Sequence, residues 1–212
     1  MTRDRKLSLY ERSVIGFVDV MTRLAYGYRT PLAEEAVRSM GVSGYFRWAK
    51  GIARTLDALT RKYGAVDAQF VIGFAGLWIG CGFCGVGHIF AGNLLLFRDH
   101  GVLSPLDNAV LRDLYETRDE EALDKIRGLL GDSRYERLRG LIERQYALRG
   151  GAPTNSTEDD DYMLAALAAW DWMTECSIAN GLDVPPEEVP PLDVVARDRQ
   201  LRDRYEAARR GG

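Results

Sequence analysis

The chain has 212 residues, of which 46% are hydrophobic and 10% aromatic, so it can bury a full core and is not disordered as a whole. Its 28 basic and 31 acidic side chains leave a formal net charge of -3, which gives no overall attraction to nucleic acid or to an anionic membrane. The basic residues at the start are not followed by an apolar run of the kind that a secretory signal needs. We therefore expect a cytoplasmic protein with neither a nucleic-acid nor a membrane partner.

Apolar residues recur at intervals of three and four almost throughout, which predicts an all-α protein. The first helix is expected over roughly residues 7–28. Its predicted apolar stripe consists of Leu9, Val14, Phe17, Val18, Met21 and Leu24. A second helix should begin at Pro31 and end in a turn over residues 41–44. The helix expected over residues 45–62 should turn these residues to the core: Phe46, Ala49, Ile52, Ala53, Leu56 and Leu59.

Residues 69–97 contain no Asp, Glu, Lys or Arg, so this segment must be buried in protein or in lipid. It is long enough to cross a bilayer. Its many glycines, however, disfavour one long helix and indicate two helices with a break or bend near Gly80. We expect burial in protein, with neighbouring subunits supplying part of the cover, and hence a homo-oligomer.

The rest of the chain should also be helical. A charged helix pair is expected over residues 105–130 and 133–149, and the acidic run 158–161 favours the N-terminus of an apolar helix that ends near residue 180. Later prolines predict a stiff linker before a charge-alternating tail helix over residues 194–210. The predicted organisation is an N-terminal helical extension (1–44), a helical domain (45–187), and a linker with its tail (188–212).

Two of the three cysteines and one of the two histidines form the pattern CxxCxxxH, at Cys81, Cys84 and His88. On a helix that advances about 100° per residue, all three share one face. The cysteines are spaced for a disulfide, and His88 can hydrogen-bond the sulfur of Cys84. A nearby imidazole and a helix N-terminus both lower the pKa of a thiol. We expect Cys84 to attack an oxidant and form a sulfenic acid, and Cys81 to resolve it as a disulfide that a separate reductant reopens.

Other roles for these residues remain open. Cysteine is often buried, so the two cysteines could be small core residues and His88 a buried histidine with its hydrogen bonds satisfied. A zinc site made by Cys81, Cys84, His88 and Cys176 would have a known Cys3His ligand set. His100, just before the turn at Gly101, is expected to be a solvated residue.

The segment Cys81-Gly-Phe-Cys84-Gly-Val-Gly-His88 resembles the CxxCxxxH signature of the alkylhydroperoxidase D and carboxymuconolactone decarboxylase superfamily. Small residues after it and the helix-ending segment 178–185 are similar as well, so the resemblance covers roughly residues 45–187. It implies an AhpD-like helical bundle that is oligomeric, here with extra N-terminal helices and a C-terminal helical tail. It also implies that two cysteines reduce small-molecule hydroperoxides without a cofactor or metal, while the histidine and an upstream glutamate relay protons. The reductant would be a dithiol protein or a small thiol.

The position of that glutamate, twelve residues before the first cysteine, is occupied by Gln69. Glutamine can hold a hydrogen bond but cannot accept a proton at neutral pH. Asp67 is the nearest carboxylate, although a regular helix would place it on another face. Asp57, Asp171 and Glu175 are acids that another helix could supply. We expect a cysteine-dependent peroxidase or thiol-disulfide oxidoreductase, and the alternatives are a non-catalytic or redox-sensing helical oligomer and a lyase of the decarboxylase type.

Overall fold

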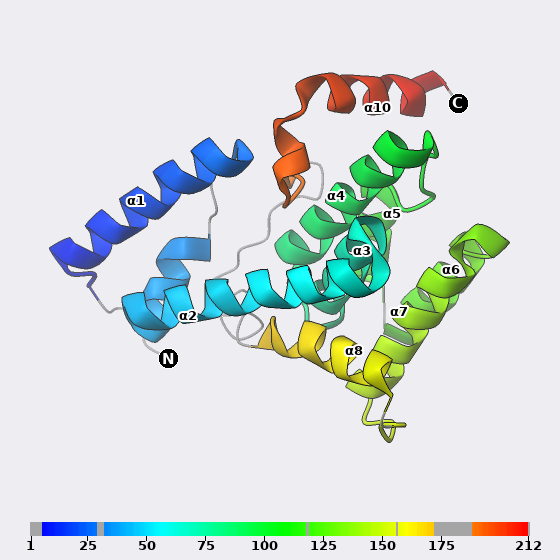
Figure 1. Ribbon diagram of the computed structural model, residues 1–212, viewed down its shortest axis with the longest axis horizontal. Helices are drawn as coiled ribbons and strands as arrows, with labels where there is room; N and C mark the ends of the chain where they lie inside the picture. Colours follow the sequence, from blue (N-terminus) through cyan, green and yellow to red (C-terminus); the bar gives the residue numbers. More distant parts are fainter. Residues whose placement is uncertain (1–5, 29–31, 118, 156, 172–187, 212) are drawn as a thin grey trace.

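The computed structural model describes residues 6–28, 32–117, 119–155, 157–171 and 188–211, and every regular element in these ranges is a helix (Figure 1). The prediction of an all-α protein is therefore confirmed. The first four helices are α1 (Leu9–Tyr26), α2 (Leu32–Tyr63), α3 (Ala65–Trp78) and α4 (Gly82–His100). The remaining elements are α5 (Asn108–Glu116), α6 (Asp119–Leu129), η1 (Ser133–Tyr135), α7 (Glu136–Arg149), α8 (Glu158–Ala168), η3 (Val194–Arg197) and α10 (Arg199–Gly211).

Helix α1 is well delimited, but only Val14 and Val18 of the predicted stripe pack against the rest of the chain. A capping box of Ser8 and Glu11 begins it, and Gly27 ends it with a φ of 83°. Val18 is buried against the first turns of α2, whereas four members of the predicted stripe are exposed: Leu9, Phe17, Met21 and Leu24. The helix carries apolar residues on both sides, so its periodicity could not distinguish the covered face from the open one.

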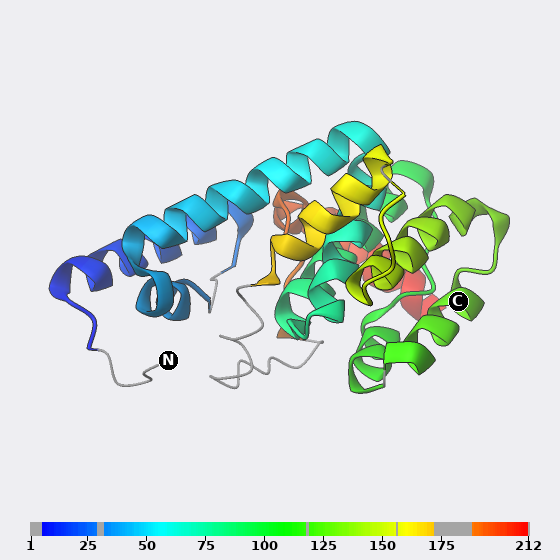
Figure 2. The same ribbon diagram turned by 90° about the horizontal axis from the view of Figure 1, so that it is seen from below.

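Helix α2 changes direction at Gly41, whose φ of 71° and ψ of 173° are not helical. The predicted turn over residues 41–44 is thus present as a kink at Gly41, and the helical parts before and after it form the single element α2 (Figure 2). Beyond the kink Leu59 is fully buried, but Phe46 and Ala53 are exposed, which corrects the predicted core face. Pro31, the expected start of this helix, lies outside the described residues.

The charge-free segment forms α3 and α4, separated by a tight turn in which Gly80 has a φ of 82°. The predicted break is therefore confirmed. Glycines allow the two helices to pack in backbone contact: a Cβ on Gly76 would lie 2.9 Å from the amide nitrogen of Gly85, and one on Gly73 would lie 2.7 Å from Cγ1 of Ile89.

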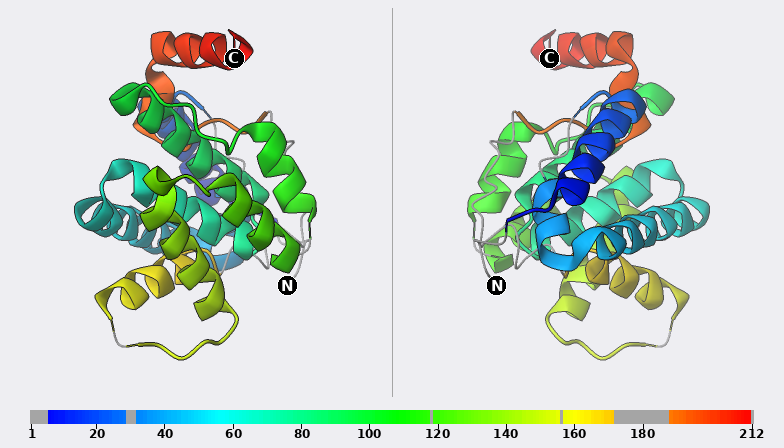
Figure 3. Two further views of the ribbon diagram at one scale, coloured as in Figure 1. Left: turned by 90° about the vertical axis from the view of Figure 1, so that its right-hand side faces the viewer. Right: turned by 90° about the vertical axis from the view of Figure 1, so that its left-hand side faces the viewer.

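Helices of the same chain cover this pair. α2, α7 and α8 pack on α3, and α10 packs on α4 through Leu201 and Tyr205. Figure 3 shows α8 and α10 at opposite edges of the molecule with α3 and α4 between them. The expected cover from neighbouring subunits is not needed to bury this pair. Within the described ranges, no helix combines the length and the apolar character that a membrane span requires.

The later elements match the predictions in part. The single helix expected over residues 105–130 is two helices. α5 begins after its N-cap Asp107 and ends at Glu116, and α6 begins at Asp119. The acidic run does open α8, with Thr157 as its N-cap. Most of the predicted continuation to residue 180 lies outside the described residues. The tail is helical as predicted, as η3 and α10.

Candidate functional site

Cys81 and Cys84 form a reduced pair at the start of α4. Cys81 is the N-cap residue and Cys84 lies in the first turn, with their Sγ atoms 2.6 Å apart. Each residue is only 1% exposed. The predicted adjacency of the two sulfurs is present, and the N-terminus of α4 contributes a partial positive charge beside them.

The two thiols differ in acidity. The hydrogen bond from the Cys84 thiol lowers the pKa of Cys81 below its ordinary value. Burial raises the pKa of Cys84 well above its ordinary value, and the neighbouring Cys81 raises it further. Once the pair has lost one proton, the negative charge therefore resides on Cys81 and Cys84 keeps its proton.

His88 lies one turn beyond Cys84 and is 5% exposed. Burial lowers the pKa of His88 to about 3, so the ring is neutral at physiological pH. Its Nδ1 is 2.7 Å from Oε1 of Gln69, and the ring lies beside Trp170 with centroids 5.5 Å apart. In the described part of the chain, no hydrogen bond joins His88 to Cys84, so the predicted contact is not formed in this state.

Gln69 is held on its other side by an aspartate that is not among the predicted site residues. Nε2 of Gln69 donates to Oδ2 of Asp193 at 2.7 Å. Asp193 ends the segment 190–193, which we call the C-terminal strap. No sequence signal connects Asp193 with His88, and the only hint is its position before η3, whose N-cap it is.

The C-terminal strap lies directly on α4. The amide of Leu192 donates to the carbonyl oxygen of Gly87 at 2.9 Å. A Cβ on Gly87 would lie 2.4 Å from Cγ of Leu192 and 2.9 Å from the carbonyl oxygen of Pro190. Only glycine at position 87 leaves room for this approach, which brings Asp193 to the residue pair Gln69 and His88.

The other predicted acids are not part of this site. Asp67 forms an ion pair with Arg137 and is not the N-cap of α3, which begins after Gly64. Asp57 is exposed and pairs with Arg61 at 2.5 Å, and Asp171 is exposed. Glu175 and Cys176 lie outside the described residues.

A groove of about 460 Å³ opens onto Cys84, His88 and Asp193. Its walls come from α1, α2, the first turns of α4, Trp170 and residues 192–194. The aromatic lining consists of Tyr26, Tyr28, Tyr45, Trp48, Phe83 and Trp170. Burial raises the pKa of Tyr28 above its ordinary value, and the neighbouring Tyr26 and Asp193 raise it further. The groove can therefore present an apolar substrate to Cys84, a neutral imidazole and a neutral phenol.

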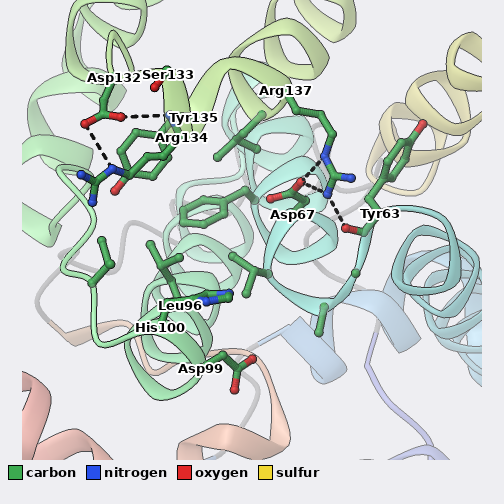
Figure 4. A pocket seen from close by; sticks show the side chains of 16 residues that line it. Tyr63, Asp67, Leu96, Asp99, His100, Asp132, Ser133, Arg134, Tyr135 and Arg137 are labelled. Carbon is green, nitrogen blue, oxygen red and sulfur yellow. Dashed lines mark hydrogen bonds and ion pairs between the residues drawn. The ribbon is translucent and has the colours of Figure 1, made fainter.

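A larger cavity of about 890 Å³ lies between the start of α3, the end of α4 and the start of α7 (Figure 4). His100 lines it and is exposed, as predicted. Its charged side chains are largely engaged with one another: Arg137 holds Asp67, and Arg134 pairs with Asp132 at 3.1 Å. None of the CxxCxxxH residues lines this cavity, whereas Cys84 and His88 line the smaller groove.

Within the described ranges, no three His, Cys, Asp or Glu side chains are grouped so that they could hold a metal ion. The fourth ligand of the zinc alternative, Cys176, is outside those ranges. Comparisons with protein-family models, curated proteins and solved structures found no match to this chain.

Proposed function

We propose that the protein is a cytoplasmic, cysteine-dependent peroxidase or thiol-disulfide oxidoreductase of the alkylhydroperoxidase D type, with small hydroperoxides as substrates. The observation that carries this proposal is the pair of reduced sulfurs, 2.6 Å apart, one turn from a buried neutral imidazole. Two thiols at this distance can exchange a proton and can close to a disulfide with a small movement. The aromatic groove beside Cys84 supports a hydroperoxide with an apolar organic group.

In this reaction Cys84 is the attacking thiol because it lines the groove. Its proton passes to His88 or to the Cys81 thiolate, and the sulfur attacks the outer peroxide oxygen. The O–O bond breaks, and the alcohol leaves after taking up a proton. The Cys84 sulfenic acid then reacts with Cys81 to give a disulfide and water. A dithiol reductant supplies two electrons and two protons to restore both thiols.

The different acidities of the thiols are consistent with this division of roles. Cys81 is the sulfur that carries the charge at rest, and a thiolate is the species that attacks a sulfenic acid. Cys84 becomes nucleophilic only when its proton is removed, which links its reactivity to the base at His88.

The test is a thiol titration in a Cys176→Ser background, so that only Cys81 and Cys84 are counted. With hydrogen peroxide or cumene hydroperoxide, we expect two thiols to disappear per peroxide consumed and to return with dithiothreitol. Cys81→Ser should stop at a sulfenic acid on Cys84 that dimedone traps, and Cys84→Ser should lose the stoichiometric reaction. If the unsubstituted pair leaves both peroxides intact, the proposal fails.

A redox sensor is the second candidate, and Gln69 favours it because an amide at this position cannot accept a proton. Such a protein would form the same disulfide but would turn over slowly. Steady-state peroxide consumption with excess dithiothreitol separates the two: many turnovers per chain support the enzyme, and a single oxidation supports the sensor.

We further propose that the protein is a homo-oligomer and that the exposed face of α1 is the contact. The large apolar residues of this face are Leu9, Phe17, Val20 and Leu24, and Tyr10 and Met21 flank them. The six residues are 47–83% exposed. Two small residues, Ser13 and Gly16, lie among them. A two-fold axis between Gly16 and Phe17 would set α1 antiparallel to its copy, with Leu9 against Leu24 and each Phe17 over a Gly16.

A further inference from the structure

We propose that Asp193 is a positioning residue that acts through Gln69 to fix the proton on Nδ1 of His88, which leaves Nε2 as the proton acceptor of the site. The hydrogen-bond chain His88–Gln69–Asp193 carries this inference, with both of its contacts at 2.7 Å. Its consequence for catalysis rests on the proposed peroxidase function, whereas its consequence for the histidine does not.

The first step concerns the amide of Gln69, which has an oxygen that accepts and a nitrogen that donates. A carboxylate only accepts hydrogen bonds, so the group that faces Asp193 must be the NH2. In the reversed orientation, the Gln69 carbonyl oxygen would face a carboxylate oxygen at hydrogen-bond distance without a proton between them. Asp193 therefore determines that the carbonyl oxygen of Gln69 points to His88.

The second step concerns the ring of His88. A carbonyl oxygen cannot donate, so Nδ1 must carry the proton that it shares with Gln69. Because burial keeps the ring neutral, it has one proton only, and the lone pair is on Nε2. When His88 takes up a second proton, the chain of donors ending at the Asp193 carboxylate stabilises the imidazolium. No proton has to move through the amide, so glutamine at position 69 is compatible with proton uptake at Nε2 of His88.

The third step concerns what brings Asp193 to this place. The C-terminal strap is fixed by the hydrogen bond between Leu192 and Gly87, and Gly87 directly precedes His88 in α4. Oδ1 of Asp193 accepts from the amide of Val195 at 2.9 Å, which holds the carboxylate while Oδ2 faces Gln69. The carboxylate of Asp193, from near the C-terminus, thus contributes to the site without touching His88. It acts through Gln69, which contacts His88 directly.

The experiment is a two-bond 1H–15N correlation spectrum of the uniformly labelled full chain, which distinguishes the two tautomers of a neutral histidine. The chain contains only two histidines, and the exposed His100 serves as an internal reference. We expect His88 to be entirely in the Nδ1–H form. Asp193→Asn replaces an obligatory acceptor by an amide that can also donate, so the Nε2–H form should rise to a readily detected fraction.

Three variants make this result specific. Asp198→Asn changes another aspartate of the same region, which caps α10 through the amide of Leu201, and should leave the tautomer unchanged. Gln69→Glu added to Asp193→Asn should restore the Nδ1–H form, because a carboxylate then accepts directly from His88. Gly87→Ala should release the strap and raise the Nε2–H form while Asp193 is intact. If His88 stays entirely Nδ1–H in Asp193→Asn, the inference is wrong.

The activity measurement separates this inference from the proposed function. We expect Asp193→Asn to slow peroxide-dependent thiol loss by about tenfold to a hundredfold, which is less than the complete loss of a general base because part of His88 keeps the Nδ1–H form. The double variant should recover most of this loss. A tautomer change without peroxide consumption in any variant would sustain the role of Asp193 and overturn the peroxidase. Peroxide consumption with an unchanged tautomer would sustain the peroxidase and overturn the role of Asp193.

Discussion

His88 is a buried base, and among the described residues no carboxylate contacts its ring directly. Its nearest polar partner is the neutral amide of Gln69, and its ring packs beside Trp170. Removing a cationic ring from water without a contacting anion is costly, and burial is the cause of its low pKa. The same property that keeps the ring available as a base makes the folded state sensitive to acid.

We predict that this sensitivity appears as a pH-dependent stability. The pKa of His88 is about 3 in the folded protein and its ordinary value is 6.5, so between these values the unfolded chain binds the additional proton. The free energy of unfolding must then fall as the pH decreases, by about 2 kcal/mol between pH 6.5 and pH 5 from this residue alone. Urea unfolding of the wild type at several pH values measures the slope.

The matched variants for this prediction are His88→Gln and His100→Gln. His88→Gln should flatten the slope between pH 6.5 and pH 5, even though it lowers stability at pH 7. His100→Gln should leave the slope unchanged, since His100 is exposed. Equal slopes in the wild type and His88→Gln would show that His88 titrates normally.

Residue spacing predicted that the sulfurs of Cys81 and Cys84 would be adjacent. Cys84 and His88 lie in α4 and Cys81 is its N-cap, so this proximity follows from local geometry, whereas Gln69 was singled out through its spacing from the CxxCxxxH pattern. Asp193 could not be predicted, because 124 residues separate it from Gln69 and the contact depends on how the C-terminal strap crosses α4. Contacts made by tertiary packing leave no periodic signal in one sequence.

Helices α3 and α4 approach one another so closely that the position of the dithiol depends on glycine. A Cβ on Gly85 would lie 2.5 Å from Leu77 Cγ and 2.9 Å from the Leu77 amide nitrogen. The turn between the two helices, which places Cys81 at the N-terminus of α4, therefore depends on this close packing. A methyl group at the contact must push the two backbones apart.

We predict that Gly76→Ala destabilises the protein by about 1–3 kcal/mol, because the added Cβ meets the backbone of α4, which cannot rotate away as a side chain can. The control is Gly140→Ala in α7, where no heavy atom lies within 4 Å of the new Cβ. That substitution should raise the free energy of unfolding by about 0.5–1 kcal/mol through helix propensity. Urea unfolding curves measure both, and a neutral Gly76→Ala would contradict the close contact.

For the helices, the sequence predicted where an element ends better than which of its sides is buried. Glycine at position 80 signalled the end of α3, since the turn needs a positive φ. The division of residues 105–130 into α5 and α6 was missed because no glycine or proline marks the break near Thr117. The exposure of most of the predicted α1 stripe was missed because both sides of the helix are apolar.

At the scale of the whole molecule, one apolar face of α1 is exposed in the part of the chain that the structure describes. α1 packs on α2 through Val14, Ile15 and Val18, and its other side points outward (Figure 1). An apolar stripe of this length is unusual on the surface of a monomer and is typical of an interface. Because α3 and α4 are covered within one chain, we place the proposed contact between copies at α1.

We predict that the protein is a dimer in solution and that Leu24→Glu or Phe17→Arg makes it monomeric. Either charge would be buried in the proposed contact, which weakens association by about a hundredfold or more. Light scattering coupled to size-exclusion chromatography over a range of concentrations measures the mass. Leu164→Glu, on the exposed side of α8, is the matched control and should leave the dimer intact, since Leu164 is 37% exposed and lies outside α1. A monomeric wild type, or a dimer that persists in both α1 variants, would exclude this face as the contact between copies.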